Sequence, residues 1–591
     1  MGIPVSSATA ATEPPIGKTT FTVGTTSQVD SFNPLLGIES SATLVYDLMY
    51  DSLTQDSNKD LSLQPRLATS WSRSADGLTW TYHIRSGLKW SDGKPLTSKD
   101  VAYTLNRVIS GGPAQANWGN FLTSVTKVTA PDEKTVLLHL DHPNATLPAI
   151  PIPIIPEHVW SHISDSQLTS FPNTPPNVVS SGPFRLVAGA AGSSTYQLEA
   201  NPNYWGGRPK IDTLRFRVFK ALDTEVQALV KGEIDFADGL SPLQVRALAS
   251  RPGITGWPAI QSGVFDEIAF NTGSIDTKTG ARIGDPNPAV LDPKFRYALN
   301  TAIDRAKIAK LAFMGGAKPA TTVVTPDFSK FVWEPPRADA PRYDPAKAAE
   351  LLTAAGYKRG HDGKLRLPNG APMEPLRLIA RPEDSSSLTT MELLKEWLGN
   401  LGIDSTVTSM DSTKLQNVIL SGDYDIFEWG WSYAEDPDAM LIYFTCGQRG
   451  LLSDSWYCNS EYDKLYTAQK QQLDPAERSE QIKKMQAILY RDAPYLLTVY
   501  PMSEQAYRSD RFHGLNPKPM PNGSLLLDAA SYLTVAPNVD AHGSAIALKG
   551  SSGSTENTNL IAIVGAGLAV LIAAGWAFAR RRGKATAGDR E

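Results

Sequence analysis

The chain has 591 residues, of which 41% are hydrophobic and 20% are charged, and its formal net charge is −5. This is the composition of a globular protein that is long enough for two or three domains. The mild acidity argues against nucleic acid as a partner, because a nucleic-acid-binding surface needs concentrated basic residues.

The first part of the chain is rich in predicted strands. A hairpin is expected within residues 63–84, because Asp76-Gly77 is a strong turn signal between two alternating runs. Thr97 or Ser98 is expected to cap a helix over residues 99–108. Periodicity predicts further strands at residues 19–25, 135–140, 184–186, 196–200 and 214–219, and a helix at residues 43–53.

From residue 224 onward, predicted helices alternate with predicted strands. Residues 376–409 are expected to form a strand, a helix and a strand, and residues 413–429 a helix followed by a buried strand. Further helices are predicted at residues 224–231, 293–312, 345–355 and 474–491. This alternation is typical of an α/β domain with a partly parallel sheet.

The C-terminal end predicts a membrane anchor. Residues 560–579 carry no charge, and a helix of this length spans roughly 30 Å, the thickness of the hydrocarbon core of a bilayer. Three arginines and Lys584 follow at once, which places residues 580–591 in the cytoplasm and the body outside. A cell-wall sorting signal would also have an apolar run and arginines, but no Leu-Pro-x-Thr-Gly precedes the run, so a single-pass span is favoured.

The segments that flank the body are expected to be loose. Residues 533–559 shift to Ala, Gly, Ser, Asn and Thr, which is typical of a flexible linker. Residues 1–18 are small, polar and Pro-containing, without the basic start and apolar core of a signal peptide. They suit the disordered start of a mature exported protein.

Cys446 and Cys458 are the two cysteines of the chain. In a protein exposed outside the cytoplasm, such a close pair is expected to form a disulfide rather than stay as two free thiols. A metal site is not expected there, because no other Cys or His lies in the stretch.

The sequence holds no catalytic constellation. It lacks a Gly-x-Ser-x-Gly elbow, a His-Glu-x-x-His helix and a phosphate-binding Gly-rich loop with Lys. The His158/His162 and His139/His142 spacings are weak metal signals by themselves. We therefore expect a protein that is not an enzyme, with no catalytic residue, no cofactor and no metal.

A series of motifs carries a family resemblance. They are Ala68-x-x-Trp71, Asp76-Gly77, Leu88-Lys89-Trp90-x-Asp92-Gly93, Pro95-Leu96-Thr97, Asp100-Val101, Ser181-Gly182-Pro183-Phe184, Asn201-Pro202-Asn203-Tyr204-Trp205, Gly232-Glu233-Ile234-Asp235, Phe295-Arg296-Tyr297-Ala298-Leu299, Ala302-Ile303-Asp304-Arg305, and Trp431 through Asp436-Pro437-Asp438. In this order they resemble the family 5 extracytoplasmic solute-binding proteins of ABC importers, which bind oligopeptides, dipeptides or nickel. The resemblance covers residues 19–530.

This resemblance implies an α/β, two-lobed periplasmic-binding-protein-like fold with an extra β-rich domain, here followed by the single C-terminal transmembrane helix. Domain I is expected at residues 19–55, 178–261 and 500–532, the β-rich domain II at 56–177, and domain III at 262–499.

Most motif residues are interpreted as structural. The Asp-Gly pairs are turns, and Trp71, Trp80 and Trp90 are expected in the core of the β-rich domain. Residues 302–305 are expected inside a helix, with an exposed charge pair.

Ligand contacts are expected in three places. The first is the loop of residues 30–34, which contains Asn33, and the second is Arg381, directly after a predicted strand. The third is the end of the strand near residue 429, with the residues Trp429, Trp431, Tyr433, Glu435 and Asp436. Three aromatics and two carboxylates suit a cationic or amine-bearing ligand. Alternation puts both tryptophans on one face, so at least one is expected in the core.

The third place departs from the family pattern. The family's peptide binders carry an aspartate that pairs with the ligand's α-amino group, whereas this chain has Tyr433 there and is one residue shorter before Pro437. Glu435 or Asp436 is the candidate substitute. Asp436 could instead cap a helix that starts at Pro437.

The resulting expectation is a membrane-anchored binding protein that captures an oligopeptide or similar solute and delivers it to an ABC permease. The alternative is a membrane-tethered receptor or chaperone-like protein with the same fold and no transport role.

Overall fold

The computed structural model describes residues 19–37, 39–433 and 436–539. All of them belong to one compact unit, Met1–Ile546. The predicted N-terminal segment 1–18, most of the predicted linker, the predicted transmembrane helix 560–579 and the predicted tail 580–591 lie outside the described residues. Within the described ranges, none of the helices has the length and apolar character that a membrane crossing requires.

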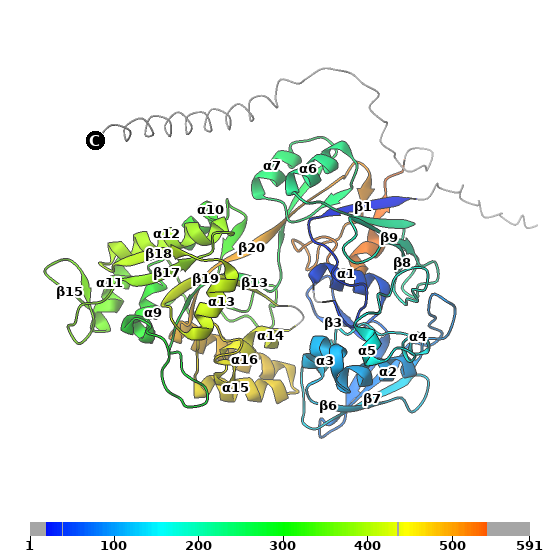
Figure 1. Cartoon of the computed structure of the whole chain (residues 1–591), viewed down its shortest axis with the longest axis horizontal. Helices are drawn as coiled ribbons and strands as arrows, with labels where there is room; N and C mark the ends of the chain where they lie inside the picture. The colour runs from blue at the N-terminus through cyan, green and yellow to red at the C-terminus, as the bar shows by residue number, and fades with distance from the viewer. Residues whose placement is uncertain (1–18, 38, 434–435, 540–591) are drawn as a thin grey trace, which may run out of the picture. The chain divides into compact units, whose positions relative to one another are not determined.

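A twelve-stranded sheet runs through the unit in the order β18-β17-β19-β13-β20-β11-β1-β10-β9-β8, with β12 and β14 also paired to β20. The long strand β20 (Tyr495–Tyr507) joins its two halves (Figure 1). Its first residues pair with β13 (Val264–Phe270), and its last residues pair with β11 (Phe236–Ala237) and β12 (Thr255–Ile260).

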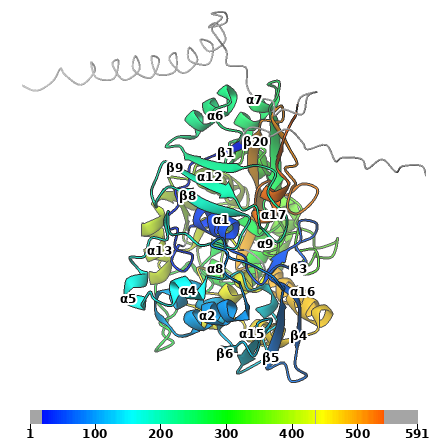
Figure 2. The ribbon, with the colours of Figure 1, turned by 90° about the vertical axis from the view of Figure 1, so that its right-hand side faces the viewer.

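The half of the sheet that carries the N-terminus is mixed. Here β1 (Thr20–Thr25) lies parallel to β10 (Thr213–Val218), and β9 (Thr195–Ala200) and β8 (Phe184–Ala188) continue antiparallel. Helices α6 (Leu222–Lys231) and α7 (Pro242–Ala249) pack against β1, β11, β12 and β20 (Figure 2). Their buried leucines and valines form a small separate core with Ala506.

The other half contains the predicted parallel units. Strand β17 (Leu376–Ala380) is parallel to both β18 (Ser405–Ser409) and β19 (Ile426–Ser432). Helices α12 (Ser385–Asn400) and α13 (Ser412–Ser421) make the two crossovers. The predicted strand–helix–strand arrangement is confirmed, with antiparallel β13 added beside β19.

The predicted hairpin opens a separate four-stranded antiparallel sheet. Its order is β4 (Ala68–Arg73), β5 (Thr79–Ile84), β7 (Thr135–Leu140) and β6 (Val125–Thr129). Trp80 and Trp90 are buried in this region, and Trp71 is half-buried against the same core. Helix α2 (Ser98–Ile109) starts with a capping box in which Thr97 and Asp100 bond each other's backbone N–H groups.

The remaining elements connect or cover these sheets. They are α1 (Ser40–Met49), β2 (Thr54–Asp56), β3 (Leu63–Pro65), α3 (Gly112–Trp118), η1 (Gly119–Leu122), η2 (Leu147–Ala149), α4 (Glu157–Trp160), α5 (Asp165–Leu168), α8 (Pro288–Leu291), α9 (Pro293–Leu299), α10 (Arg305–Leu311), β14 (Ala317–Pro319), α11 (Pro345–Ala354), β15 (Lys358–Arg359), β16 (Leu365–Arg366), α14 (Asp438–Leu441), η3 (Ile442–Phe444), η4 (Cys446–Gln448), α15 (Ser460–Gln471), α16 (Pro475–Asp492), β21 (Phe512–His513), α17 (Ala529–Thr534) and β22 (Ala536–Pro537).

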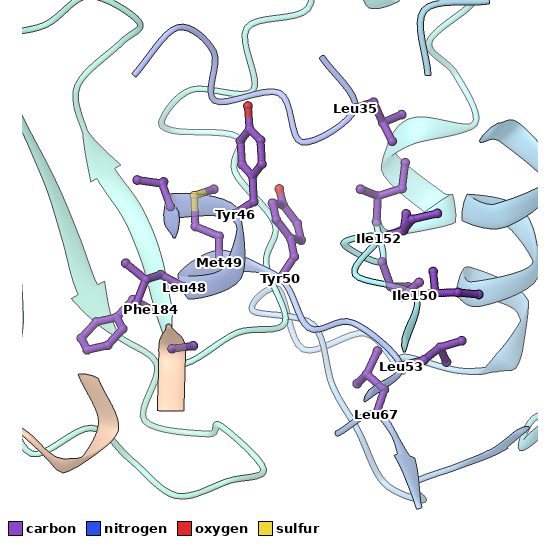
Figure 3. Close-up of a cluster of buried hydrophobic side chains, with 14 of the residues drawn as sticks. Leu35, Tyr46, Leu48, Met49, Tyr50, Leu53, Leu67, Ile150, Ile152 and Phe184 are labelled. Carbon is purple, nitrogen blue, oxygen red and sulfur yellow. The ribbon is translucent and has the colours of Figure 1, made fainter. Parts of the chain in front are cut away.

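Helix α1 packs against β8 of the mixed sheet and against α17. Leu48 and Met49 lie on the side of α1 that faces Phe184 of β8 (Figure 3). Ile150 and Ile152 lie beside the segment that follows α1, which carries Leu53 (Figure 3). All of these side chains belong to one continuous buried cluster, which also includes core residues of the mixed sheet and of the four-stranded sheet.

One prediction was wrong in an informative way. Residues 293–312 form two helices, α9 and α10, because Asp304 caps the second helix and its Oδ1 accepts from the N–H of Lys307 at 2.9 Å. Arg305 is buried, and its guanidinium donates to the backbone oxygens of Leu497 (2.6 Å) and Asn300 (2.9 Å). The expected exposed charge pair inside one helix is therefore a cap followed by a buried cation.

The disulfide is confirmed. Cys446 and Cys458 are bonded, with their Cα atoms 4.3 Å apart. The bond closes the loop between η4 and α15.

Candidate functional site: a charged cavity beside α1

A cavity of about 540 Å³ lies next to α1. One wall comes from residues 40–66, Trp118, residues 149–153 and residues 518–530. The other wall contains Ser262, Phe328 and Tyr433, from the part of the chain that builds β13 and β19. The cavity thus gathers segments that are hundreds of residues apart, as ligand sites between lobes do.

Arg66 organises the charges on the α1 side. Its Nε donates to Asp51 Oδ1 at 2.7 Å, and its Nη1 forms an ion pair with Asp47. Asp47 also accepts the backbone N–H of Ala529 at 2.6 Å. Both carboxylates are therefore engaged, and the Arg66 side chain is almost fully buried between them.

A second ion pair comes from the C-terminal segment. Lys518 Nζ lies 2.6 Å from Asp528 Oδ2, and the other oxygen of Asp528 accepts the N–H of Ser531 at the start of α17. Burial alone would lower the pKa of Lys518, but Asp528, Asp56 and Asp47 hold that pKa above its usual range. The environment of this ammonium is therefore dominated by carboxylates.

Asp56, at the end of β2, is the charged residue of the cavity lining that has no ion pair among the described residues. Three carboxylates and two cations line the cavity among the described residues, and Asp47 and Asp528 are taken by Arg66 and Lys518. No described residue donates a hydrogen bond to the Asp56 side chain. Burial is the largest cause that raises the Asp56 pKa; Lys518 opposes the rise, while Asp528, Asp436 and Asp47 add to it.

The opposite wall is aromatic. Tyr433 stacks on Phe328 with ring centroids 5.4 Å apart, and its hydroxyl accepts the backbone N–H of Thr325 at 3.0 Å. Among the described residues that were predicted to bind ligand, Tyr433 is the one that lines this cavity. A stacked pair held in this way offers a rigid apolar face to a solute.

Asn33 has a structural setting. Its side chain is buried, and Nδ2 donates to the backbone oxygens of Leu168 (3.1 Å) and Phe171 (3.0 Å). Asn33 is absent from the described lining of the cavity, and its predicted role as a ligand contact stays a prediction.

Arg381 and Trp429 meet each other away from the cavity lining. The guanidinium lies 4.7 Å from the ring centroid of Trp429, and Nη2 contacts Glu428 Oε2 at 3.1 Å. Burial raises the pKa of Glu428, and Arg381 counters this rise. Arg381 and Trp429 were two separate ligand-contact predictions from the sequence, and they stay predictions; their contact with each other and the buried carboxylate that holds the arginine were not predicted.

Trp431 is half-buried, and its ring lies 4.8 Å from that of Tyr443. Its Nε1 donates to Asp454 Oδ2 at 3.3 Å, and burial raises the pKa of Asp454 to about 6. Both tryptophans pack against the core on the β19 side.

Of the two candidate carboxylates Glu435 and Asp436, the structure describes Asp436. Asp436 accepts two hydrogen bonds from Arg478 and a third, at 2.9 Å, from the N–H of Asp438. The capping alternative therefore has the structural support, and the carboxylate is not free. Glu435 lies outside the described residues.

The charged groups of the cavity were not predicted. A signal for them existed, since Asp47 and Asp51 stand four residues apart in an otherwise apolar stretch, where charge needs a partner. Their partner Arg66, and the Lys518–Asp528 pair, could not be assigned from sequence distance.

Comparison with known proteins decides the family. Residues 62–450 match the sequence profile of the bacterial extracellular solute-binding proteins, family 5. The chain belongs to this family. It is therefore a solute-binding protein of the ABC-importer type, in a family of extracellular proteins. Its two-lobed α/β fold is also the fold of its solved structural neighbours.

The relatives bind different solutes. A putative ABC transporter peptide-binding protein of Brucella ovis is 28% identical over 434 residues, 71% of this chain and 75% of the relative. The oligopeptide-binding protein AppA of Bacillus subtilis is 25% identical over 494 residues, 82% and 86% of the two chains. Its structure with a nonapeptide matches with a TM-score of 0.66 over 89% of this chain and 100% of AppA, at 22% identity. NikZ of Campylobacter jejuni, solved with Ni(L-His), matches with a TM-score of 0.68 over 88% and 100%, at 20% identity.

Proposed function

We propose that this family 5 protein captures an oligopeptide or similar solute in the cavity beside α1 and delivers it to the permease of an ABC importer. The observation that carries the proposal is the cavity of about 540 Å³ with one charged and one aromatic wall. Such a mixture of apolar surface and a few placed charges is what small-molecule sites use for affinity and orientation. The names of the relatives, which include peptide and oligopeptide binders, support a peptide.

Capture is proposed to involve closure of domain III (262–499) on domains I (19–55, 178–261, 500–532) and II (56–177). The pairing of β20 supports a hinge near residue 500, since Val499 still pairs with β13 and Met502 already pairs with β12. Closure would remove the solute from water and strengthen its polar contacts.

The binding part of the proposal is tested with two matched tryptophan variants of the full chain. Thr43 lines the cavity from α1, and Thr353 lies on α11; both are exposed, and each hydroxyl bonds the carbonyl four residues earlier. Thr43→Trp is expected to block the cavity and lower peptide affinity at least tenfold in calorimetric titration, whereas Thr353→Trp leaves affinity unchanged. Equal affinities for both variants would place the solute elsewhere. Mass spectrometry of solutes released from the wild-type chain by denaturation should show peptides.

The anchor is a separate part of the proposal and rests on the sequence alone. The uncharged run of residues 560–579 and the arginines after it support a single-pass span with the body outside. A chain that ends at Thr558 should appear in the soluble extracytoplasmic fraction, while the full chain stays with membranes. If the shortened chain still sediments with membranes, another anchor holds it.

A further inference from the structure

The excess negative charge of the cavity suggests what it selects. Arg66 pairs with both Asp47 and Asp51, and Lys518 pairs with Asp528, so both cations of the cavity are already held by carboxylates. Asp56 has no ion-pair partner of its own within 4.0 Å among the described residues, although it lines the same cavity. A solute that fills this cavity therefore meets an excess of negative charge and, at Asp56, a carboxylate that no described cation pairs with.

Asp56 also lies where two hollows meet. Together with Gln55 and Ala530, it lines both the cavity beside α1 and a second hollow of about 500 Å³ bounded by Ser57, Asn58 and Arg85. A group bound at Asp56 can thus belong to a solute that extends to either side. The short antiparallel pairing of β2 with β3, in which Asp56 is opposite Leu63, fixes the backbone of this residue.

We propose that Asp56 binds a positively charged nitrogen group of the solute, either the α-amino group of a peptide or a basic side chain. This deepens the proposed function and rests on it, because it names the charge that the same cavity selects. A partly desolvated carboxylate without a partner is costly, and an ammonium or guanidinium group removes that cost by forming a charge-assisted hydrogen bond.

The direction of the pKa shift is consistent with this assignment. The charged groups that act on Asp56 are Lys518, which lowers its pKa, and Asp528, Asp436 and Asp47, which raise it together with burial. A bound cation would counter burial and these three carboxylates, so solute binding and ionisation of Asp56 favour each other.

The proposal differs from the sequence-based hypothesis for the amine site. That hypothesis assigned the amine to Glu435 or Asp436, next to Tyr433. Asp436 is held by Arg478, whereas Asp56 is not paired among the described residues.

The test compares three synthetic pentapeptide libraries on the full chain by native mass spectrometry. The first has free α-amino groups and no Lys, Arg or His; the second is identical but acetylated; the third is acetylated and contains Lys and Arg. Wild-type protein should bind the first or the third library at least tenfold more than the second. Preference for the first library assigns the α-amino group, and preference for the third assigns a basic side chain.

Asp56→Asn should lower binding of the preferred library at least tenfold and remove the preference over the second library. Asp60→Asn is the matched control: Asp60 lies four residues along, is exposed, and is absent from the described lining of both hollows. It should behave as wild type, and both variants should keep the wild-type melting temperature within a few degrees.

Equal binding of all three libraries by wild type, or an unchanged preference in Asp56→Asn, overturns the assignment of Asp56 while leaving peptide binding intact. If wild type binds none of the libraries, the peptide assignment itself fails, and the inference falls with it.

Discussion

Arg478 and Asp436 form a two-point ion pair, in which Nη1 lies 2.7 Å from Oδ2 and Nη2 lies 2.6 Å from Oδ1. The Arg478 side chain is 7% exposed, so the arginine depends on this carboxylate for compensation. The pair joins the segment after β19 to α16.

Asp436→Ala should therefore lower stability and leave solute affinity unchanged. Removing one partner of a largely buried pair costs about 3 kcal/mol, which urea unfolding would measure. Glu480→Ala on the same helix is the control, since Glu480 is exposed and pairs with Lys483 at 3.1 Å on the surface; its effect should be close to zero. A large loss of solute affinity without loss of stability in Asp436→Ala would instead assign Asp436 as a ligand contact.

The disulfide should stabilise the loop between η4 and α15. Its cysteines are separated by 12 positions, and closing a loop of this size stabilises a fold by about 3 kcal/mol in the chain-entropy model. The double variant Cys446→Ser/Cys458→Ser should unfold at correspondingly lower urea concentration than the oxidised wild type. Reduced wild type is the control and should match the variant. Alkylation of two thiols in the native exported protein would contradict the bond.

Stability should depend on pH through Glu225, which is buried on α6 next to β1. Burial raises its pKa from 4.5 to about 7. Between these values the folded state keeps a proton that the unfolded chain has released, so stability should fall as pH rises from about 4.5 to about 7 and then level off with respect to this group.

Glu225→Gln removes this contribution. A raised pKa costs the folded state roughly 1.4 kcal/mol per pKa unit once the group is ionised, and structural relaxation around the charged group reduces this cost. At pH 8 the variant should therefore be about 2 kcal/mol more stable than wild type. Glu233→Gln, at an exposed carboxylate paired with Arg217 at 3.2 Å, should leave the pH profile unchanged. A wild-type slope that persists in Glu225→Gln would assign it to other buried carboxyl groups.

Gly182, in the family motif Ser181-Gly182-Pro183-Phe184, permits a close approach of two backbones. An added Cβ would lie 2.5 Å from the carbonyl oxygen of Leu48, at the end of α1. Gly182→Ala should therefore destabilise the protein by about 2 kcal/mol, as overpacking does. The same substitution at Gly399 in α12, where an added Cβ would meet no atom within 4 Å apart from the adjoining backbone of its own helix, should stabilise by up to about 1 kcal/mol. Equal melting temperatures of the two variants would contradict this reading of the motif.

The sequence predicted the fold well where the signals are local. The Asp-Gly turn between β4 and β5, the Thr97 cap of α2 and the parallel strands around α12 follow from spacing within a few tens of residues. It failed at residues 300–304, where the periodicity of α9 and α10 runs on through a break. The break depends on Asp304 as a cap and on the distant oxygen of Leu497, which periodicity does not register.

For the candidate site too, the sequence predicted features with local signals and missed those that depend on distant parts of the chain. The aromatic cluster at the end of a strand made Tyr433 a predicted ligand contact; Tyr433 lines the cavity, and its contact with a ligand stays a prediction. The disulfide was predicted from the cysteine spacing and is confirmed. Asp56, Arg66, Lys518 and Asp528 come together only when β20 has brought the C-terminal segment back to α1. The sequence by itself determined the family, the α/β class and the disulfide, since these depend on residue types at short spacing. That these charges line one cavity is decided by tertiary structure, because Lys518 and Asp528 meet Asp56 and Arg66 across more than 400 residues of chain, and a charge interaction depends on distance in space and burial, which the spacing along the chain does not encode.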